Sequence, residues 1–110
     1  LSDRRTDLII SGGVNIYPRE VEDVLTLHPA VADVAVIGIP DEEMGQRVHA
    51  VVEPADPDAA GPELAEELIA FCRERIAHFK APKSVSFEQI PRLPSGKILR
   101  RALMERYAAE

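Results

Sequence analysis

Features that would define several function classes are missing from this sequence of 110 residues. It holds one cysteine, Cys72, which excludes an internal disulfide framework and a cysteine-rich metal site and fits a reducing cytoplasm. It has no apolar run long enough to span a bilayer, and it opens with no signal-peptide pattern. The three histidines, His28, His49 and His78, lack the spacing of metal ligands. We therefore expect one small domain in the cytoplasm without a membrane span or a metal site.

The charge balance excludes a further class and points to one region. The formal net charge of −6 argues against a general nucleic-acid binder. Residues 73–106, however, carry nine basic and three acidic side chains, so that this stretch is cationic and the rest of the chain is strongly acidic. Such an asymmetry favours a localised anion-binding surface, with a solvated helical face as the alternative.

Hydrophobic periodicity predicts a mixed fold. Apolar residues spaced for one helix face, together with proline and glycine breaks, define helices and strands in the order β-α-β-β-α-β-α. The two central strands most simply pair antiparallel. The expected class is α+β, a small mixed or antiparallel sheet packed with about three helices. The predicted strands cover residues 7–10, 31–39, 48–53 and 84–90, and the predicted helices cover 18–28, 63–78 and 97–107.

The predicted start of the final helix carries positive charges, which the helix dipole disfavours at that end. Lys97, Arg100 and Arg101 fall in its predicted first turn, where cations oppose the helix dipole and where free N–H groups attract anions. Either these cations bind a phosphate or carboxylate, or they face solvent and pair with acids elsewhere. The second reading is favoured for Arg101. For Lys97, which follows a turn-forming Pro-Ser-Gly, anion binding is favoured.

Five short segments together resemble one family, the acyl-adenylate-forming enzymes that include the acyl-CoA synthetases. The match is to their C-terminal domain, it covers essentially the whole chain, and the segments occur in the family's order and spacing. They are Asp3–Glu22 with Ser11-Gly12-Gly13, Val36–Asp41, Gly45-Gln46, Phe79–Lys83, and Pro94–Arg101 with Pro94-Ser95-Gly96-Lys97.

The resemblance implies a two-step reaction and a missing partner. In this family a large N-terminal domain binds ATP with Mg and the carboxylic acid, and an acyl-adenylate forms. The small domain then rotates, and a thiol, usually of coenzyme A, takes the acyl group. Residues 1–110 would be the mobile C-terminal domain, with its own N-terminal adenylation domain absent from this chain. Alone, the fragment is expected to be inactive, and the acid would be a fatty acid or another carboxylic acid.

The resemblance also assigns roles to single residues. Lys97 matches the catalytic lysine of adenylation, whose ammonium can stabilise the charge that develops at the α-phosphate. Arg4 matches a nucleotide-binding arginine. Thr6 occupies the hinge position, where the family usually has Asp or Lys.

Four residues match positions that face coenzyme A after rotation: Gly12, Gly13, Phe79 and Lys83. The glycines would line the pantetheine tunnel, and the alternative is an ordinary turn. Phe79 would pack on the cofactor, or else close the core after the preceding helix. Lys83 would meet a phosphate, a role that Lys80 could also take.

Two other functions remain open at this stage. The acceptor thiol could belong to a carrier protein, as in adenylation domains of peptide synthetases. Alternatively, the chain could be a stand-alone interaction module that docks its basic stripe on an acidic partner. Such a module would need neither Lys97 nor the paired glycines.

Overall fold

Residues 8–108 form two small sheets and three α-helices, which confirms the predicted α+β class. The structure is a computed structural model that describes residues 8–108. The main sheet has the order β3-β4-β5, and a separate hairpin is formed by β1 and β2. Strand β3 pairs antiparallel with β4 as predicted, and β5 runs parallel to β4. The elements are β1 (Ile9–Ser11), β2 (Val14–Ile16), α2 (Pro18–Leu25), β3 (Val31–Asp41), β4 (Gly45–Pro54), η1 (Pro57–Ala59), α3 (Pro62–Arg73), η2 (His78–Lys80), β5 (Ser84–Phe87) and α4 (Arg100–Ala108).

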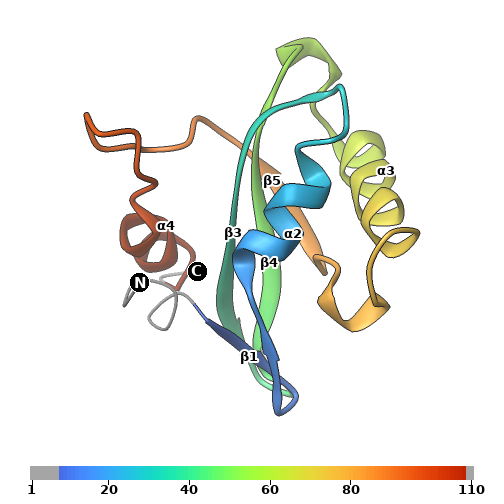
Figure 1. Ribbon diagram of the computed structural model, residues 1–110, viewed down its shortest axis with the longest axis vertical. Coiled ribbons are helices and arrows are strands. Elements are labelled where there is room, and N and C mark those ends of the chain that lie inside the picture. The colour runs from blue at the N-terminus through green and yellow to red at the C-terminus, as the bar shows by residue number, and fades with distance from the viewer. Residues whose placement is uncertain (1–7, 109–110) are drawn as a thin grey trace.

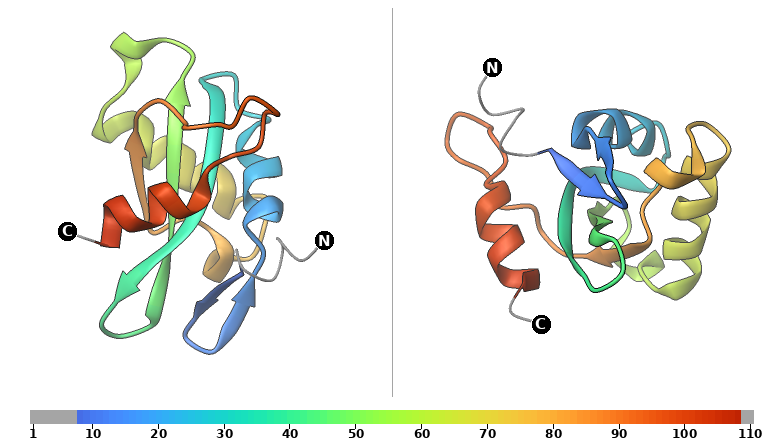
Figure 2. Two further views of the ribbon diagram at one scale, coloured as in Figure 1. Left: turned by 90° about the vertical axis from the view of Figure 1, so that its left-hand side faces the viewer. Right: turned by 90° about the horizontal axis from the view of Figure 1, so that it is seen from below.

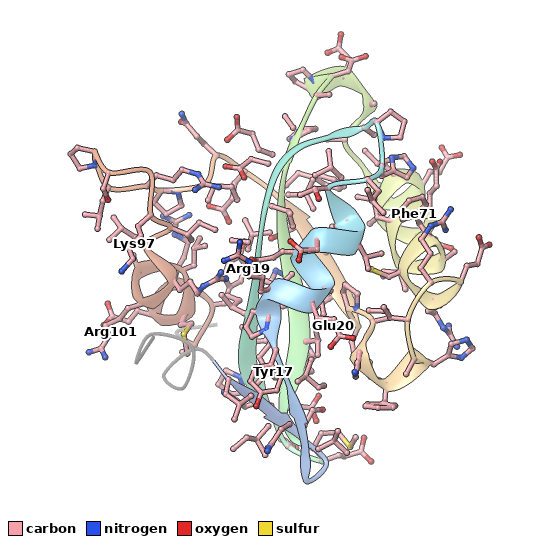
Figure 3. All side chains as sticks on the ribbon, in the orientation of Figure 1. Tyr17, Arg19, Glu20, Phe71, Lys97 and Arg101 are labelled. Atoms are coloured by element: carbon pink, nitrogen blue, oxygen red, sulfur yellow. The ribbon has the colours of Figure 1, made fainter. Side chains whose placement is uncertain are left out.

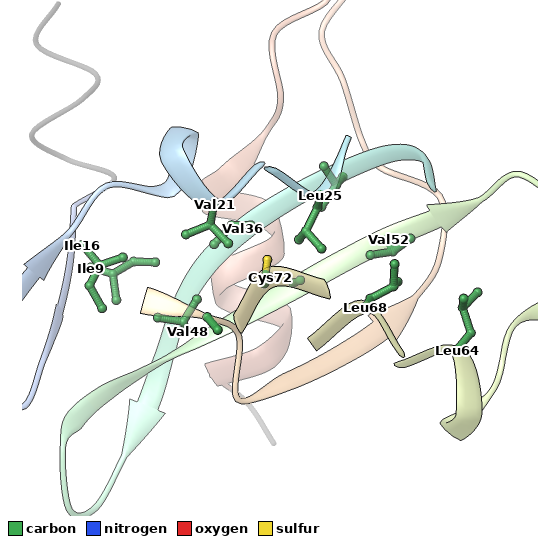
Figure 4. Close-up of a cluster of buried hydrophobic side chains, with 13 residues drawn as sticks. Ile9, Ile16, Val21, Leu25, Val36, Val48, Val52, Leu64, Leu68 and Cys72 are labelled. Carbon is green, nitrogen blue, oxygen red and sulfur yellow. The ribbon is translucent and has the colours of Figure 1, made fainter. Parts of the chain in front are cut away.

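Helices cover both faces of the main sheet. Figures 1 and 2 show α2 and α3 on one side of the sheet and α4 on the other. Strands β3 and β4 are therefore covered on both faces, which explains why β3 has a nearly continuous apolar run. Its alternate side chains enter two clusters, Val34 and Val36 toward α2 and α3, and Ala35 and Ile37 toward α4. Figure 4 shows the larger cluster, in which Cys72 is fully buried.

Several element boundaries differ from the sequence-based prediction. The strand β2 was not predicted, because three residues are too short to show a period. Helix α2 ends at Leu25 and α3 at Arg73, each several residues before the predicted end. Helix α4 begins at Arg100, so the prediction that Lys97 lies in its first turn is wrong. In the part of the chain from residue 8 to residue 108, no helix has the length and apolarity needed to cross a membrane.

A buried polar network fastens β5 and α4 together. His49 on β4 is 5% exposed, and its Nδ1 and Nε2 lie 2.7 Å and 2.9 Å from the hydroxyls of Ser84 and Ser86. The Ser86 hydroxyl lies 2.5 Å from the Tyr107 hydroxyl, and the Tyr107 ring packs on His49 with centroids 4.6 Å apart. Burial, with a smaller contribution from the nearby Arg47, lowers the pKa of His49 from 6.5 to about 4.

This shift predicts a loss of stability in mild acid. The unfolded chain takes up a proton on His49 near pH 6.5, whereas the folded chain resists it until about pH 4. The free energy of unfolding should therefore fall as the pH drops through this window, by up to about 3 kcal/mol from this group. Urea unfolding at stepped pH measures the slope. A His49→Gln variant should show a shallower slope, and an unchanged slope would remove His49 as the cause.

Candidate functional site

Lys97 lies on a tight turn just before α4. The Gly96 N–H donates to the Leu93 carbonyl at 2.8 Å, and the Leu93 N–H donates to the Lys97 carbonyl at 2.8 Å. Gly96 has φ +94°, a left-handed conformation that suits glycine at the third position of such a loop. A bridge between Arg92 and Ile98 closes the base of the loop. The turn therefore holds the exposed Lys97 side chain on a defined backbone rather than on a free linker.

An ion pair anchors this turn to the start of β3. The Arg92 guanidinium donates from Nε and Nη2 to the two Asp33 carboxylate oxygens, at 2.8 Å and 2.6 Å. Its remaining nitrogen, Nη1, donates to the Gly96 carbonyl. These bonds from Arg92 hold the pKa of the Asp33 carboxyl below its usual range. The side of the turn opposite Lys97 is thus tied to the main sheet.

A second anchor lies on the other side of Lys97, at the first residue of α4. Arg100 contacts both carboxylate oxygens of Glu22, and its Nη2 donates to Oε1 at 2.9 Å. The Glu22 and Arg100 side chains are 11% and 17% exposed. This pairing agrees with the sequence alternative in which Arg100 meets an acid elsewhere, whereas Arg101 is exposed.

Lys97 also borders a surface groove between α2 and the segment that leads into α4. The groove is lined by side chains of both signs, and Figure 3 shows Arg19 from α2 and Lys97 from the turn on this side of the molecule. Its cationic lining residues are Arg19, Arg92, Lys97, Arg100 and Arg101, and its acidic ones are Glu22, Asp23, Asp33 and Glu105.

Gly12 and Gly13 form the turn of the β1–β2 hairpin. Their φ values of +59° and +82° are both positive, as a two-residue type I′ turn requires. The Gly12 N–H donates to the Met44 carbonyl at 2.9 Å, so this turn rests on the tip of the β3–β4 hairpin. A side chain at Gly12 would place its Cβ 2.6 Å from the Met44 methyl carbon, whereas a Cβ at Gly13 would meet nothing within 4 Å. Gly13 is therefore the open position of the turn.

The Met44 hairpin tip is itself held by Asp41. The Asp41 carboxylate accepts hydrogen bonds from the N–H groups of Met44, at 3.0 Å, and Glu43, at 2.9 Å. These bonds, the Met44 bond foremost, lower the pKa of Asp41. Met44 itself is 41% exposed beside the glycine turn.

Phe79, Lys80 and Lys83 lie around the short helix η2. Phe79 is 50% exposed, so it does not close the core, which was the alternative reading of this residue. The Lys80 ammonium lies 3.0 Å from the Glu20 carboxylate, which leaves Lys80 engaged with α2. Lys83 is exposed. Of the two lysines, Lys83 is therefore the better placed to meet an anionic ligand.

Two of the predicted site features lie on separate parts of the domain. Figure 3 shows Lys97 on the flank beside α4, and Figure 1 shows the β1–β2 turn, which carries Gly12 and Gly13, at the bottom of the same view. Arg4 and Thr6 lie outside the described residues.

Cys72 and the buried His28 do not form a second reactive site. Burial raises the pKa of the Cys72 thiol to about 11, which keeps it protonated and unreactive. His28 is buried, and its Nε2 lies 2.7 Å from the Glu67 carboxylate. Among residues 8–108, no group of three His, Cys, Asp or Glu side chains is arranged to hold a metal ion.

Sequence reasoning missed the two acids that anchor the Lys97 segment, Asp33 and Glu22. For Glu22 a signal existed. The buried residues of α2 are Pro18, Val21, Glu22 and Leu25, so that Glu22 falls on the core-facing stripe of the helix. A carboxylate at such a position requires a cationic partner. For Asp33, in an exposed strand position by sequence, no such signal was present.

Comparisons with known proteins identify the family of this chain. A family model described as the AMP-binding enzyme C-terminal domain matches residues 20–97, and the chain belongs to this family. The chain is 48% identical, over 96% of its length and 20% of the relative's, to a 3-[(3aS,4S,7aS)-7a-methyl-1,5-dioxo-octahydro-1H-inden-4-yl]propanoyl:CoA ligase of Rhodococcus jostii. It is 46% identical to the long-chain-fatty-acid–CoA ligase FadD13 of Mycobacterium tuberculosis, over 99% of this chain and 21% of that protein.

A solved structure gives the same result in three dimensions. The Mycobacterium tuberculosis fatty acyl CoA synthetase superposes with a TM-score of 0.85 and 44% identity, over 94% of this chain and 20% of that one. The chain therefore spans about a fifth of the length of the relatives that it matches.

Proposed function

We propose that residues 1–110 form the mobile C-terminal domain of an AMP-forming acyl-CoA ligase, which converts a carboxylic acid to an acyl-adenylate and then to an acyl-CoA. The observation that carries this proposal is the separation of two ordered features. An exposed lysine on an anchored turn lies on the flank beside α4, and a glycine turn with an open face lies on a separate part of the domain. Each feature suits one half-reaction.

In the adenylation step, Lys97 would act as the catalytic cation. A carboxylate oxygen of the acid attacks the α-phosphorus of ATP, and pyrophosphate leaves. The Lys97 ammonium stabilises the negative charge shared by the entering oxygen and the phosphate, and it transfers no proton. ATP with its Mg would be held mainly by the N-terminal domain.

In the thioester step, the part of the domain that carries the β1–β2 turn would face the active site. The thiol of coenzyme A attacks the acyl carbonyl carbon, its proton passes to solvent or a base, and AMP leaves. Gly12 and Gly13 would admit the pantetheine arm, because their turn has no side chains. Phe79 supplies an exposed aromatic surface, and Lys83 supplies a cation for a phosphate of the nucleotide.

Rotation about a hinge would connect the two steps. Lys97 and the glycine turn lie on separate parts of the domain, so a rotation would bring each in turn to the active site. Thr6 is the proposed pivot, and Arg4 the proposed nucleotide contact beside it. A hinge of this kind absorbs its change of φ and ψ at a few residues between rigid bodies.

A comparison of the isolated chain with the full-length enzyme tests the proposal. The chain alone should form no acyl-adenylate from ATP and acid, whereas the full-length enzyme that contains it should. Coenzyme A and a phosphopantetheinylated carrier protein are then offered as acceptors to that enzyme, and thioester formation is measured for each. Coenzyme A should be the acceptor. If the acyl group is transferred only to the carrier protein, the acceptor is that of a peptide-synthetase adenylation domain. If the full-length protein has no adenylation activity at all, the alternative of a stand-alone interaction module is favoured.

A further inference from the structure

Glu22, Val36 and Arg100 form one closed polar cluster between α2, β3 and α4. Among the described strands β3 is an edge of the main sheet, so within residues 8–108 the outward N–H and C=O of Val36 face no neighbouring strand. The Val36 N–H donates to Glu22 Oε2 at 2.8 Å, and the Val36 carbonyl accepts from Arg100 Nη1 at 3.0 Å. Together with the two-point Arg100–Glu22 pair, this arrangement replaces the missing strand.

Apolar packing alone fixes α4 weakly. Of the nine residues of α4 only Leu103 is buried, and the helix has little hydrophobic asymmetry. Met104 and Tyr107 are partly buried against the same cluster, and the Tyr107 hydroxyl is hydrogen-bonded to Ser86, so these contacts lie in the middle and C-terminal part of the helix. The Arg100 cluster supplies the attachment at the first residue of the helix, three residues after Lys97.

The Lys97 segment is therefore attached to β3 on both sides. Arg92 binds Asp33 at the start of the strand, and Arg100 binds Glu22 and the Val36 carbonyl near its middle. The Arg92 pair is more open to water, with side chains 37% and 26% exposed, whereas the Arg100 pair is largely buried. A buried pair contributes more to a unique orientation than to stability.

From this geometry we infer that Arg100 and Glu22 are positioning residues for Lys97 in the adenylation step. The inference rests on the proposed function. The pair sets where the turn that carries Lys97 leaves the sheet, and it touches neither ATP nor the acid. Because a displacement of about 1 Å at a reacting group can cost about 10²-fold in rate, a loosened anchor should be visible in catalysis. Thioester formation, which is proposed to use the β1–β2 turn, should not depend on the Arg100–Glu22 pair.

The experiment compares half-reactions in the full-length enzyme. For Arg100→Met we expect kcat of adenylation, followed by pyrophosphate exchange, to fall about tenfold, while the KM values for ATP and acid change less than about twofold. Thioester formation from supplied acyl-adenylate should stay within about twofold of the parent. Glu22→Gln, which keeps an acceptor for the Val36 N–H but removes the charge, should act in the same direction. Arg100→Lys should recover part of the rate.

A matched control and a double variant separate positioning from folding. Arg106→Met removes another ion pair from the same helix, the one with Glu88, and should leave both half-reactions unchanged. In the Lys97→Ala background, adding Arg100→Met should cost less than about twofold more, because a residue that acts through Lys97 has nothing left to position. The inference would be overturned if the rate losses of Lys97→Ala and Arg100→Met multiplied in the double variant. It would also be overturned if Arg100→Met slowed both half-reactions equally. If Lys97→Ala alone spares adenylation, the proposed function fails first.

Discussion

Replacing Lys97 with alanine in the full-length enzyme is expected to slow acyl-adenylate formation by roughly 10²–10³, the scale of losing one preorganised electrostatic group. The side chain is exposed on a turn that is tied to the main sheet on both sides. Its removal therefore leaves the domain folded and takes away one charge at a defined place. Thioester formation from supplied acyl-adenylate should survive much better, because we propose that it uses the β1–β2 turn, which lies on a separate part of the domain.

The measurement pairs pyrophosphate exchange with the second half-reaction. Lys97→Arg is the informative companion variant, because it keeps the positive charge but replaces a compact ammonium with a planar guanidinium. It should recover only part of the adenylation rate. Thermal unfolding should be the same for all three proteins. Equal losses of both half-reactions in Lys97→Ala would show that the residue serves the fold or the domain interface instead of adenylation.

How far the sequence determines this fold can be seen in β3 and β2. The run from Val31 to Ile39 predicted a strand, and its pairing with β4 was correct because both strands are apolar on two faces. Strand β2 was missed, since Val14, Asn15 and Ile16 show no period. The end of α2 was misplaced because its last apolar positions continue into the turn at His28, where packing rather than propensity decides.

In the candidate site, the sequence predicts the local backbone but not the contacts between distant residues. The residues Pro94 to Lys97 predicted a loop, and the structure has a turn there, because proline and glycine determine backbone angles locally. The partners of Arg92 and Arg100, by contrast, lie 59 and 78 residues away along the chain. Nothing in the neighbourhood of either arginine identifies Asp33 or Glu22.

These distant partners also change the reading of the charge asymmetry. The cationic stretch 73–106 suggested an anion-binding surface, but three of its cations pair with acids from the first part of the chain. They are Lys80 with Glu20, Arg92 with Asp33, and Arg100 with Glu22. The asymmetry therefore serves in part to dock the C-terminal segment onto α2 and β3. Lys83 and Lys97 are among the exposed residues of that stretch, and each is assigned to one proposed half-reaction.

Replacing Gly13 with isoleucine should produce the reverse of the Lys97 result. Gly13 has φ +82°, where a β-branched residue is strained, yet its Cβ would enter open space rather than the protein. The added side chain would therefore project from the turn to where the pantetheine arm is proposed to pass. We expect thioester formation to fall about 10²-fold, the cost of displacing a reacting group by about 1 Å, while pyrophosphate exchange stays near the parent rate.

A graded series separates the added bulk from the backbone strain. Gly13→Asn tolerates positive φ, Gly13→Ala adds strain with one carbon atom, and Gly13→Ile adds both strain and bulk. If the turn faces coenzyme A, the loss of thioester formation should grow with side-chain size, and KM for coenzyme A should rise along the series. The free energy of unfolding should instead follow the strain, by about 1 kcal/mol for a non-glycine residue in this region. Equal turnover by all three variants would mean that Gly12 and Gly13 serve only to close the β1–β2 hairpin.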